Sequence, residues 1–315
     1  MPELAEQVGG GPPSGTVLGL VGVGHMGYPM ASRLIDAGYT VRCYDADTNA
    51  LQRAAERGAQ PVDAPAQAVT GATAVLLSLP SSDVVEDVLL NGGIAEAATP
   101  GTVLVDMGSS RPSSTRMLGQ RLARRQVGYV DAPVSGGVAG AESGRLTIMV
   151  GGPDWAVATV RPVLDMLGSK VLHVGEVGAG HALKALNNLL SATHLLATSE
   201  AMRIGEAFGL NAEIMLAALN SSSGRSGSTE VKWPDYVLPG SYDSGFGLRL
   251  MLKDMRIAVE LASDTGRSAA LAEAAVGLWD QAARSLPADA DHTEIVRWLD
   301  QLAADQTQMS DHHPV

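Results

Sequence analysis

The chain contains few cysteines and few basic residues. Cys43 is the single cysteine among 315 residues, which excludes an internal disulfide and a metal site built from several cysteines. This usage is typical of a reducing compartment, so we expect a cytoplasmic location. Twenty-two Lys and Arg residues stand against 34 Asp and Glu residues, a formal net charge of −12. Nucleic-acid binding requires a basic surface that displaces counterions, so no nucleic-acid partner is expected.

The chain also lacks a long uninterrupted apolar run. Its most apolar long window, residues 183–210, contains Lys184 and Glu200 among other polar residues. A bilayer-spanning helix needs about 20 consecutive apolar residues, so this window predicts a buried helix and no membrane partner is expected. The N-terminus carries Glu3 and Glu6 where a signal peptide carries basic residues followed by an apolar segment. No signal peptide is therefore expected.

Both ends of the chain are rich in polar or small residues. We expect residues 1–14 and 304–315 to be flexible tails. The second of these contains His312 and His313. Two histidines at a polar terminus are read as solvated side chains, so no metal site is expected.

The first half of the chain alternates between short apolar runs and segments of helical length. The predicted strands between Thr16 and Gly175 are TVLGLVGV, YTVRCYD, TAVLLSL, GTVLVDM, VGYVDAPV, LTIMVGG and KVLHVG. The predicted helices between them are residues 28–38, 48–58, 82–90, 112–126 and 154–167. This alternation predicts βαβ units. We therefore expect residues 15–177 to form a Rossmann-type α/β domain with a doubly wound, mainly parallel sheet.

The alternation ends after Gly180. Apolar residues then recur at steps of three and four from Leu183 to Phe208, which is typical of one long amphipathic helix. Asn211 is a predicted N-cap, and Gly266 is a predicted helix stop. Further helices are predicted at residues 212–219, 248–263, 269–285 and 294–303. Residues 178–303 are thus expected to form an all-α C-terminal domain.

A glycine-rich turn follows the first predicted strand and opens a helix. Its sequence is Gly22-Val23-Gly24-His25-Met26-Gly27, a G-x-G-x-x-G motif. In such a loop the first glycine permits a tight turn, the second lets a pyrophosphate approach, and the third lets helix and strand pack closely. The pyrophosphate lies on the helix N-terminus, where N–H groups and the helix dipole favour anions. These six residues are therefore predicted to bind a dinucleotide.

An acidic residue ends the second predicted strand, 23 residues after Gly22. The carboxylate of Asp45 can accept hydrogen bonds from the ribose hydroxyls of NAD, whereas it would repel the 2′-phosphate of NADP. Asp47 adds a second negative charge, and the next basic residue is Arg53. The sequence thus favours NAD over NADP. A structural glycine turn beside a surface aspartate is the alternative interpretation.

Four blocks of the sequence carry a family resemblance. They are GLVGVGHMGYPMASRLIDAGYTV, DAPVSGGVAGAESGRLTIMVGG, GAGHALKALNNLL and FGLRLMLKDMRIAVELA. In this order and spacing they resemble the β-hydroxyacid dehydrogenase family, which includes 3-hydroxyisobutyrate dehydrogenase and tartronate semialdehyde reductase. The resemblance covers Thr16 to Gly266 and implies an oxidoreductase with a 6-phosphogluconate dehydrogenase-like fold.

The family's segment D-x-P-V-S-G-G forms a substrate-binding turn. The resemblance assigns this role to Ser135, Gly136 and Gly137, and a hydroxyl beside unhindered backbone N–H groups can bind a carboxylate. An ordinary glycine turn between strands is the alternative. Arg145 stands where many members of the family carry a small or hydroxylated residue.

The family's catalytic lysine lies in the motif G-x-G-x-x-x-K-x-x-N-N and corresponds to Lys184. Asn188 lies one helical turn later, and the resemblance implies that it orients the substrate oxygen with help from Asn187. A lysine near the start of a helix senses the positive end of the helix dipole, which favours the neutral amine and suits a general acid/base. An exposed helix lysine is the alternative.

The resemblance implies further cofactor contacts. Lys253, which precedes Asp254, matches a lysine that lies beside cofactor and substrate, with an exposed ion pair as the alternative. Leu79 and Pro80 follow one predicted strand and Ser109 follows another. Open α/β sheets place their ligands at such carboxyl ends.

The residues together predict an NAD-dependent oxidoreductase. It would interconvert a small 3-hydroxy carboxylate similar to 3-hydroxyisobutyrate and its semialdehyde or ketone, with Lys184 as general acid/base. Residues 15–177 would bind NAD, and residues 178–303 would contact substrate and form a homodimer or homotetramer. Arg225 and Trp233 are candidate pocket residues, although Trp233 equally fits a core position. The alternatives are an imine reductase-like enzyme, a type that usually lacks the lysine, and a non-catalytic NAD(H)-binding regulatory protein.

Overall fold

The computed structural model describes residues 15–310, with side chains described up to residue 302. The chain divides into two compact units, Met1–Lys184 and Ala185–Val315, which we call the Rossmann domain and the helical domain. The division falls inside one helix and lies seven residues after the predicted boundary at residue 177. The predicted tail at residues 1–14 and the pair His312-His313 lie outside the described residues.

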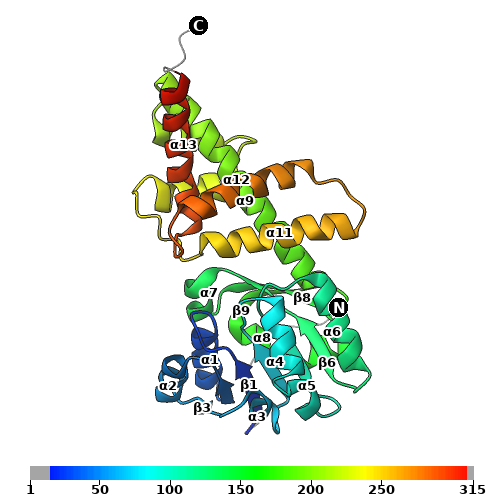
Figure 1. Ribbon diagram of the computed structural model, residues 1–315. Helices are drawn as coiled ribbons and strands as arrows, with labels where there is room; N and C mark the ends of the chain where they lie inside the picture. The colour runs from blue at the N-terminus through cyan, green and yellow to red at the C-terminus, as the bar shows by residue number, and fades with distance from the viewer. Residues whose placement is uncertain (1–14, 311–315) are drawn as a thin grey trace, which may run out of the picture. The chain divides into compact units, whose positions relative to one another are not determined.

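Nine strands form one sheet in the described part of the Rossmann domain (Figure 1). They are β1 (Val17–Val21), β2 (Thr40–Tyr44), β3 (Gln60–Pro61), β4 (Ala74–Leu77), β5 (Val103–Asp106), β6 (Gly128–Asp131), β7 (Val134–Ser135), β8 (Leu146–Gly151) and β9 (Gly168–Gly175). The strand order is β3-β2-β1-β4-β5-β6-β8-β7, and β9 pairs with β8. The first six strands are parallel to one another, which confirms the predicted mainly parallel sheet.

Eight helices cover the two faces of this sheet in the described residues. They are α1 (Gly27–Asp36), α2 (Thr48–Glu56), α3 (Pro65–Val69), α4 (Ser82–Leu90), α5 (Ile94–Ala97), α6 (Pro112–Ala123), α7 (Gly137–Ser143) and α8 (Asp154–Leu167). Side chains of β1 alternate between the two cores, since Leu18 and Leu20 pack in one and Val21 packs in the other. Buried residues of α1, α2 and α8 belong to the first core, and those of α4, α5 and α6 belong to the second. This arrangement is doubly wound, as predicted.

The antiparallel part of the sheet departs from the predicted alternation. The run VGYVDAPV, predicted as one strand, forms two, because Pro133 has no N–H to donate to a ladder. The second of these strands, β7, pairs antiparallel with β8.

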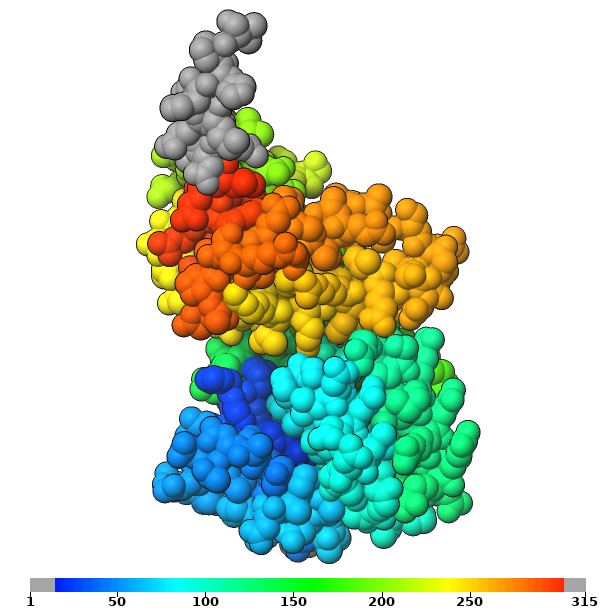
Figure 2. Space-filling view, viewed as in Figure 1, coloured from blue at the N-terminus to red at the C-terminus, as the bar shows by residue number. Residues whose placement is uncertain are grey.

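In Figure 2, the surfaces of α4 and α6 adjoin on the visible side of the Rossmann domain, where the two helices pack against each other.

The helical domain has no strand of its own among its described residues. Its elements are α9 (Ala179–Phe208, shared with the Rossmann domain), α10 (Ala212–Asn220), the π-helix η1 (Ser228–Val237), α11 (Leu248–Asp264), α12 (Ala270–Ser285), the 3₁₀ turn η2 (His292–Glu294) and α13 (Ile295–Ser310). The side chain of Asn211 accepts a hydrogen bond from Ile214 N at 3.0 Å, which confirms the predicted N-cap. Gly266 follows the end of α11 with φ +66°, which confirms the predicted stop.

The last helix differs from its predicted end. The backbone of α13 continues to Ser310, seven residues beyond the predicted helix end at residue 303. Residues 304–310 contain neither Gly nor Pro, so no residue there interrupts helical hydrogen bonding. Part of the predicted C-terminal tail therefore belongs to this helix.

Candidate functional site

The glycine loop after β1 has the geometry that a bound pyrophosphate requires. Gly22 has φ +92°, and a Cβ there would overlap Ser78 O of the neighbouring strand end. A Cβ on Gly27 would overlap Gly22 O. Both glycines therefore serve the tight turn and the close packing of α1. A Cβ on Gly24 would meet no atom within 4 Å, so the space beside this residue is open, as the approach of a pyrophosphate requires.

The loop lies at the point where the strand order reverses. β1 pairs with β2 on one side and with β4 on the other, so crossovers leave the sheet in opposite directions there. In open α/β sheets, such a switch point forms a crevice at the carboxyl ends of the strands. Leu79 and Pro80 follow β4, and Ser109 follows β5. A Cβ on Gly108 would lie 2.8 Å from Leu79 O, so these two strand ends lie close together.

Asp45 lies directly beside the glycine loop. Its Oδ2 accepts a hydrogen bond from Val23 N at 2.6 Å, and its Oδ1 accepts one from Asp47 N at 2.9 Å. The guanidinium of Arg53 stacks over the ring of Tyr28 at 5.2 Å. The acidic side chain at the end of β2 is thus brought to the loop, while the next cation along the chain is held against an aromatic ring. His25 of the loop is exposed and Met26 is partly buried.

The predicted substrate-binding turn joins β7 to α7. Ser135 ends β7 opposite Thr147, and Gly136 and Gly137 follow with φ +128° and +62°. Both glycines are exposed, and a side chain at either would strain the backbone. Arg145 is exposed beyond α7 and donates a hydrogen bond from its Nε to Ser143 Oγ at 3.1 Å.

Lys184 is buried, with 8% of its surface exposed, so the exposed-lysine alternative is wrong. It lies near the start of α9, whose first residues pack closely on the sheet. A Cβ on Gly180 would overlap Met149 O of β8 and lie 2.8 Å from Asp131 O of β6. The glycines of the G-x-G-x-x-x-K motif therefore let α9 begin directly against the strand ends, and the lysine follows one turn later.

The start of α9 is bonded to a buried carboxylate that sequence reasoning had not assigned. Asp131 Oδ1 accepts a hydrogen bond from Gly178 N at 2.7 Å, and Oδ2 accepts one from His181 N at 2.9 Å. The positive end of the α9 dipole is thus offset by a carboxylate, so the dipole alone does not determine the charge state of Lys184. Burial raises the pKa of Asp131, although His181 and the two backbone donors act in the opposite direction.

His181 is enclosed with Asp131 in one polar cluster. The Oγ1 of Thr115 donates to Arg111 O at 3.0 Å and lies 2.8 Å from His181 Nδ1. Since the hydroxyl has one hydrogen, Nδ1 is the donor to Thr115. Nε2 of the ring lies 3.6 Å from Asp106 Oδ2. The spacing of these residues in the sequence gives no signal of the cluster, since 50 residues separate Asp131 from His181.

Asn188 lies one turn after Lys184 on α9 and is buried within the helical domain. Its Nδ2 donates a hydrogen bond to Asp254 Oδ2 at 2.6 Å, and its Oδ1 accepts one from Asn187 Nδ2 at 3.2 Å. Lys253 Nζ lies 3.5 Å from Asp254 Oδ1. The structure thus brings Asn187, Asn188 and Lys253 together around one buried carboxylate.

The two remaining candidates differ in exposure. Arg225 is exposed, with its Nε 3.3 Å from Glu230 Oε1. Trp233 is 3% exposed and packs in the core of the helical domain, as its core interpretation predicted. Its side chain is one of the buried residues of η1.

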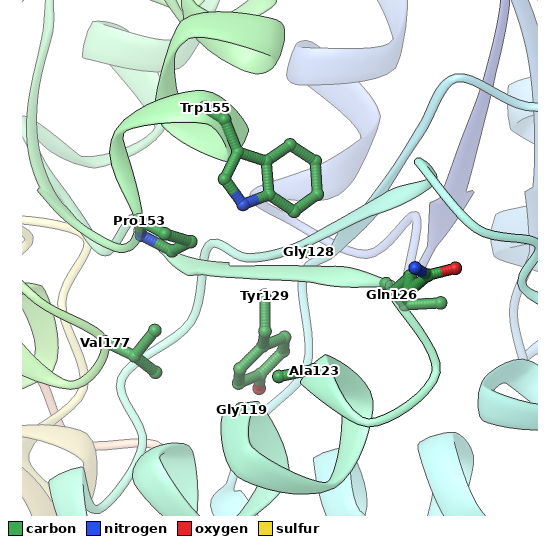
Figure 3. Close-up of a pocket in the computed structure, with 9 residues that line it drawn as sticks. Gly119, Ala123, Gln126, Gly128, Tyr129, Pro153, Trp155 and Val177 are labelled. Carbon is green, nitrogen blue, oxygen red and sulfur yellow. The ribbon is translucent and has the colours of Figure 1, made fainter.

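A hollow of about 400 Å³ lies elsewhere in the Rossmann domain (Figure 3). It is lined by Gly119, Ala123, Gln126, Val127, Gly128, Tyr129, Pro153, Trp155 and Val177. None of these side chains is charged, and none belongs to the glycine loop or to the turn at Ser135. This hollow therefore offers no positive charge to a carboxylate or a pyrophosphate.

Neither a metal centre nor a membrane span is found in residues 15–310. No three His, Cys, Asp or Glu residues of this part gather to hold a metal ion. No helix in the same part is both long and apolar enough to cross a bilayer.

A doubly wound sheet, a glycine loop at its switch point and a helix-borne buried lysine define a dinucleotide-dependent oxidoreductase. Residues 17–175 match the family described as the NAD binding domain of 6-phosphogluconate dehydrogenase. Residues 178–299 match the family described as NAD-binding of NADP-dependent 3-hydroxyisobutyrate dehydrogenase. The chain belongs to the β-hydroxyacid dehydrogenase family, as its sequence motifs indicated.

Individual relatives support this assignment. The chain is 38% identical over 244 residues to 2-(hydroxymethyl)glutarate dehydrogenase of Eubacterium barkeri, covering 77% of this chain and 81% of that protein. It is 34% identical over 290 residues to NAD-dependent L-serine dehydrogenase of Pseudomonas aeruginosa, covering 90% and 97%. The structure of Mycobacterium tuberculosis 3-hydroxyisobutyrate dehydrogenase with L-serine superposes with a TM-score of 0.85 at 30% identity, covering 90% of this chain and 99% of that one.

Proposed function

We propose that the protein is an NAD-dependent dehydrogenase that oxidises the primary alcohol of a 2-substituted 3-hydroxypropionate to the semialdehyde, and catalyses the reverse reduction. The substrates named for the three relatives share a hydroxymethyl group on the carbon that carries the carboxylate, and they differ in the second substituent of that carbon. The observation that carries the proposal is the buried Lys184, held near the start of α9 in a chain whose sheet carries a dinucleotide loop.

The groups needed for each part of this reaction are present. Ser135 and the backbone of Gly136 and Gly137 would hold the substrate carboxylate. Lys184 would take the hydroxyl proton during oxidation and return it during reduction. Asn188 has two amide hydrogens, one of which bonds to Asp254, and the other would orient the substrate oxygen with Asn187 nearby. NAD, when bound, supplies the hydride acceptor.

The cofactor would lie along the carboxyl ends of the strands. The loop Gly22-Val23-Gly24-His25-Met26-Gly27 would hold the pyrophosphate, and Asp45 would accept the ribose hydroxyls. Leu79, Pro80 and Ser109 would flank the bound dinucleotide, and Lys253 would contact it. We propose NAD over NADP because Asp45 and Asp47 place negative charge where a 2′-phosphate would lie.

Homo-oligomerisation through the helical domain belongs to the same proposal. Several large apolar side chains of α9 and α10 are exposed, among them Ile204 at 71% and Phe208 at 83%. Exposed apolar side chains four residues apart on one helix face, as these two are, are typical of subunit interfaces. A homodimer or homotetramer is expected. Size-exclusion chromatography with light scattering would measure the mass of the assembly.

A spectrophotometric assay of NADH formation tests the proposed activity. Oxidation would be followed with NAD and then NADP against 3-hydroxyisobutyrate, L-serine, glycerate, threonate and 4-hydroxybutyrate, and reduction with the matching semialdehydes. We expect turnover of a 2-substituted 3-hydroxypropionate, with kcat/KM roughly tenfold or more higher for NAD, because a like-charge contact with the 2′-phosphate is unfavourable. Turnover of cyclic imines alone would favour the imine reductase alternative. Tight NADH binding without turnover would favour the regulatory alternative.

A further inference from the structure

Asp131 ends β6, and its carboxylate lies so close to two glycines that neither of them could carry a side chain without displacing it. A Cβ on Gly151 would lie 2.7 Å from Asp131 Oδ1, and one on Gly180 would lie 2.9 Å from Oδ2. The carboxylate is completely buried and accepts hydrogen bonds from the backbone of Gly178 and His181. It therefore connects the sheet directly to the start of α9.

An ionised group in such a place has a measurable cost. A buried carboxylate with two neutral backbone donors loses more hydration than those bonds replace, and burial accordingly raises the pKa of Asp131. An apolar contact would attach a helix to a sheet without this cost. What the carboxylate supplies and apolar packing does not is a negative charge. This charge lies at the start of α9, the helix that carries Lys184.

We propose that Asp131 is a positioning residue for Lys184. It fixes the first turn of α9, and its negative charge keeps the Lys184 amine protonated to higher pH than the helix dipole alone would allow. His181 and Thr115 complete the attachment, since the imidazole is fixed by its hydrogen bond to Thr115. This proposal rests on the proposed function only for its consequence: Lys184 is set as a proton donor near neutral pH and as a proton acceptor at alkaline pH.

Other ionisable groups surround this region. Asp106 from β5 and Tyr129 from β6 face the cluster, and burial together with the carboxylates of Asp106 and Asp131 raises the pKa of Tyr129 well above its usual value. The remaining groups come from α4 and α6, and they are Glu86 and Arg116. Of these carboxylates, Asp131 is the one bonded to two backbone N–H groups at the start of α9. The charge of Asp131 is therefore the one to change.

The test measures the titration of Lys184 directly, without substrate turnover. Trace acylation of the full-length protein with acetic anhydride across a pH series, with mass spectrometry of the peptides, reports the neutral fraction of each lysine. The exposed Lys170 serves as the internal reference. In Asp131→Asn we expect the labelling midpoint of Lys184 to fall by about one pH unit, the size that Coulomb's law gives for a unit charge acting over roughly 10 Å at an effective dielectric of 20. An unchanged midpoint in a folded variant overturns the proposal.

Two further variants separate charge from attachment. Asp106→Asn removes a neighbouring buried carboxylate that accepts hydrogen bonds from Gly108 N and Ser110 Oγ rather than from the backbone at the start of α9, and its shift should be less than half as large. Thr115→Val removes the hydrogen bond to His181 and leaves the charge of Asp131, so kcat should fall while the labelling midpoint stays in place. A shift in Thr115→Val equal to that in Asp131→Asn would contradict the assignment to charge.

The wild-type protein provides a measurement that does not depend on the folding of any variant. If the charge of Asp131 offsets the dipole, the midpoint of Lys184 lies within about one unit of that of Lys170. A midpoint two or more units lower overturns the proposal. The substrate assignment is tested separately, because a shift in Asp131→Asn without any turnover on the substrate panel rejects the proposed substrate and retains the positioning role. Turnover without a shift rejects the positioning role alone.

Discussion

Asp131 in the Rossmann domain and Asp291 in the helical domain both bind backbone N–H groups, yet their pKa values move in opposite directions. Asp131 has two backbone donors and is fully buried. Asp291 accepts hydrogen bonds from the backbone of Gly245, Phe246 and Thr293 and from the hydroxyls of Ser244 and Thr293. Burial alone would raise the pKa of Asp291, but bonds from His292, Thr293 and Ser244 hold it well below the usual value.

The difference shows what each carboxylate does for its domain. A lowered pKa means that the ionised form is more stable in the folded chain than in the unfolded one, so Asp291 stabilises the helical domain at neutral pH. A raised pKa means the reverse, so ionised Asp131 makes the Rossmann domain less stable at neutral pH. Stability therefore explains Asp291, whereas Asp131 calls for a functional reason.

The largest expected effect is the loss of turnover when Lys184 is replaced. Lys184→Ala should lower kcat by about a thousandfold or more, because the proton acceptor for the substrate hydroxyl is lost. NADH affinity, measured by fluorescence titration, should change less than about threefold, because the glycine loop is untouched. Lys170→Ala, on an exposed lysine, is the matched control and should retain full activity. Lys184→Ala with near-normal turnover would refute the proposed mechanism.

The next effect should appear in the stability of the helical domain. Asp291→Ala should lower the free energy of unfolding by about 3 kcal/mol, because three backbone N–H groups lose their acceptor. Urea denaturation followed by circular dichroism would measure the loss. Asp289, two residues earlier and exposed, provides the control, and Asp289→Ala should change stability by less than about 0.5 kcal/mol. Equal losses in the two variants would show that the network around Asp291 is not stabilising.

Acidification should act on the two carboxylates with opposite signs. The stabilisation by Asp291 is present above its unfolded pKa of 3.8 and is lost as pH falls below that value. The stability difference between wild type and Asp291→Asn should therefore shrink below about pH 4, by up to about 1.4 kcal/mol per unit. For Asp131→Asn, wild type should instead gain relative stability as pH falls toward 3.8 from the raised pKa of Asp131. Urea titrations at several pH values would measure both slopes. Slopes of the same sign would show that the pKa values of Asp131 and Asp291 do not shift in opposite directions.

Local patterns in the sequence predicted most of the fold. The predicted helices at residues 82–90 and 154–167 match α4 and α8, since capping and apolar periodicity are both local signals. The short α7 and the π-helix η1 were not predicted. A glycine-rich seven-residue segment has little helical propensity, and η1 contains Pro234 inside the helix. Tertiary packing decides both elements.

The candidate site was predictable only where a motif was contiguous. The glycine loop and Asp45 could be placed because their spacing follows from one βαβ unit, and the structure brings them together through Val23. Asp131 belongs to a recognised motif, yet its bonds reach residues 47 and 50 positions later. Such contacts depend on the packing of α9 against β6 and β8, which no local pattern encodes.

The smallest effect compares two helical glycines, one in each domain. Gly277 of α12 is exposed, and a Cβ there would meet no atom within 4 Å. Gly277→Ala should therefore stabilise the protein by about 0.5–1 kcal/mol, because alanine restricts the unfolded chain and favours helix. Gly119 of α6 has the same propensity to gain, but a Cβ there would lie 2.8 Å from Val177 Cγ1. Gly119→Ala should gain nothing or lose up to about 1 kcal/mol, since Val177 must move. Thermal melts of both variants would measure the difference, and an equal gain would show that the packing of Val177 on α6 is loose.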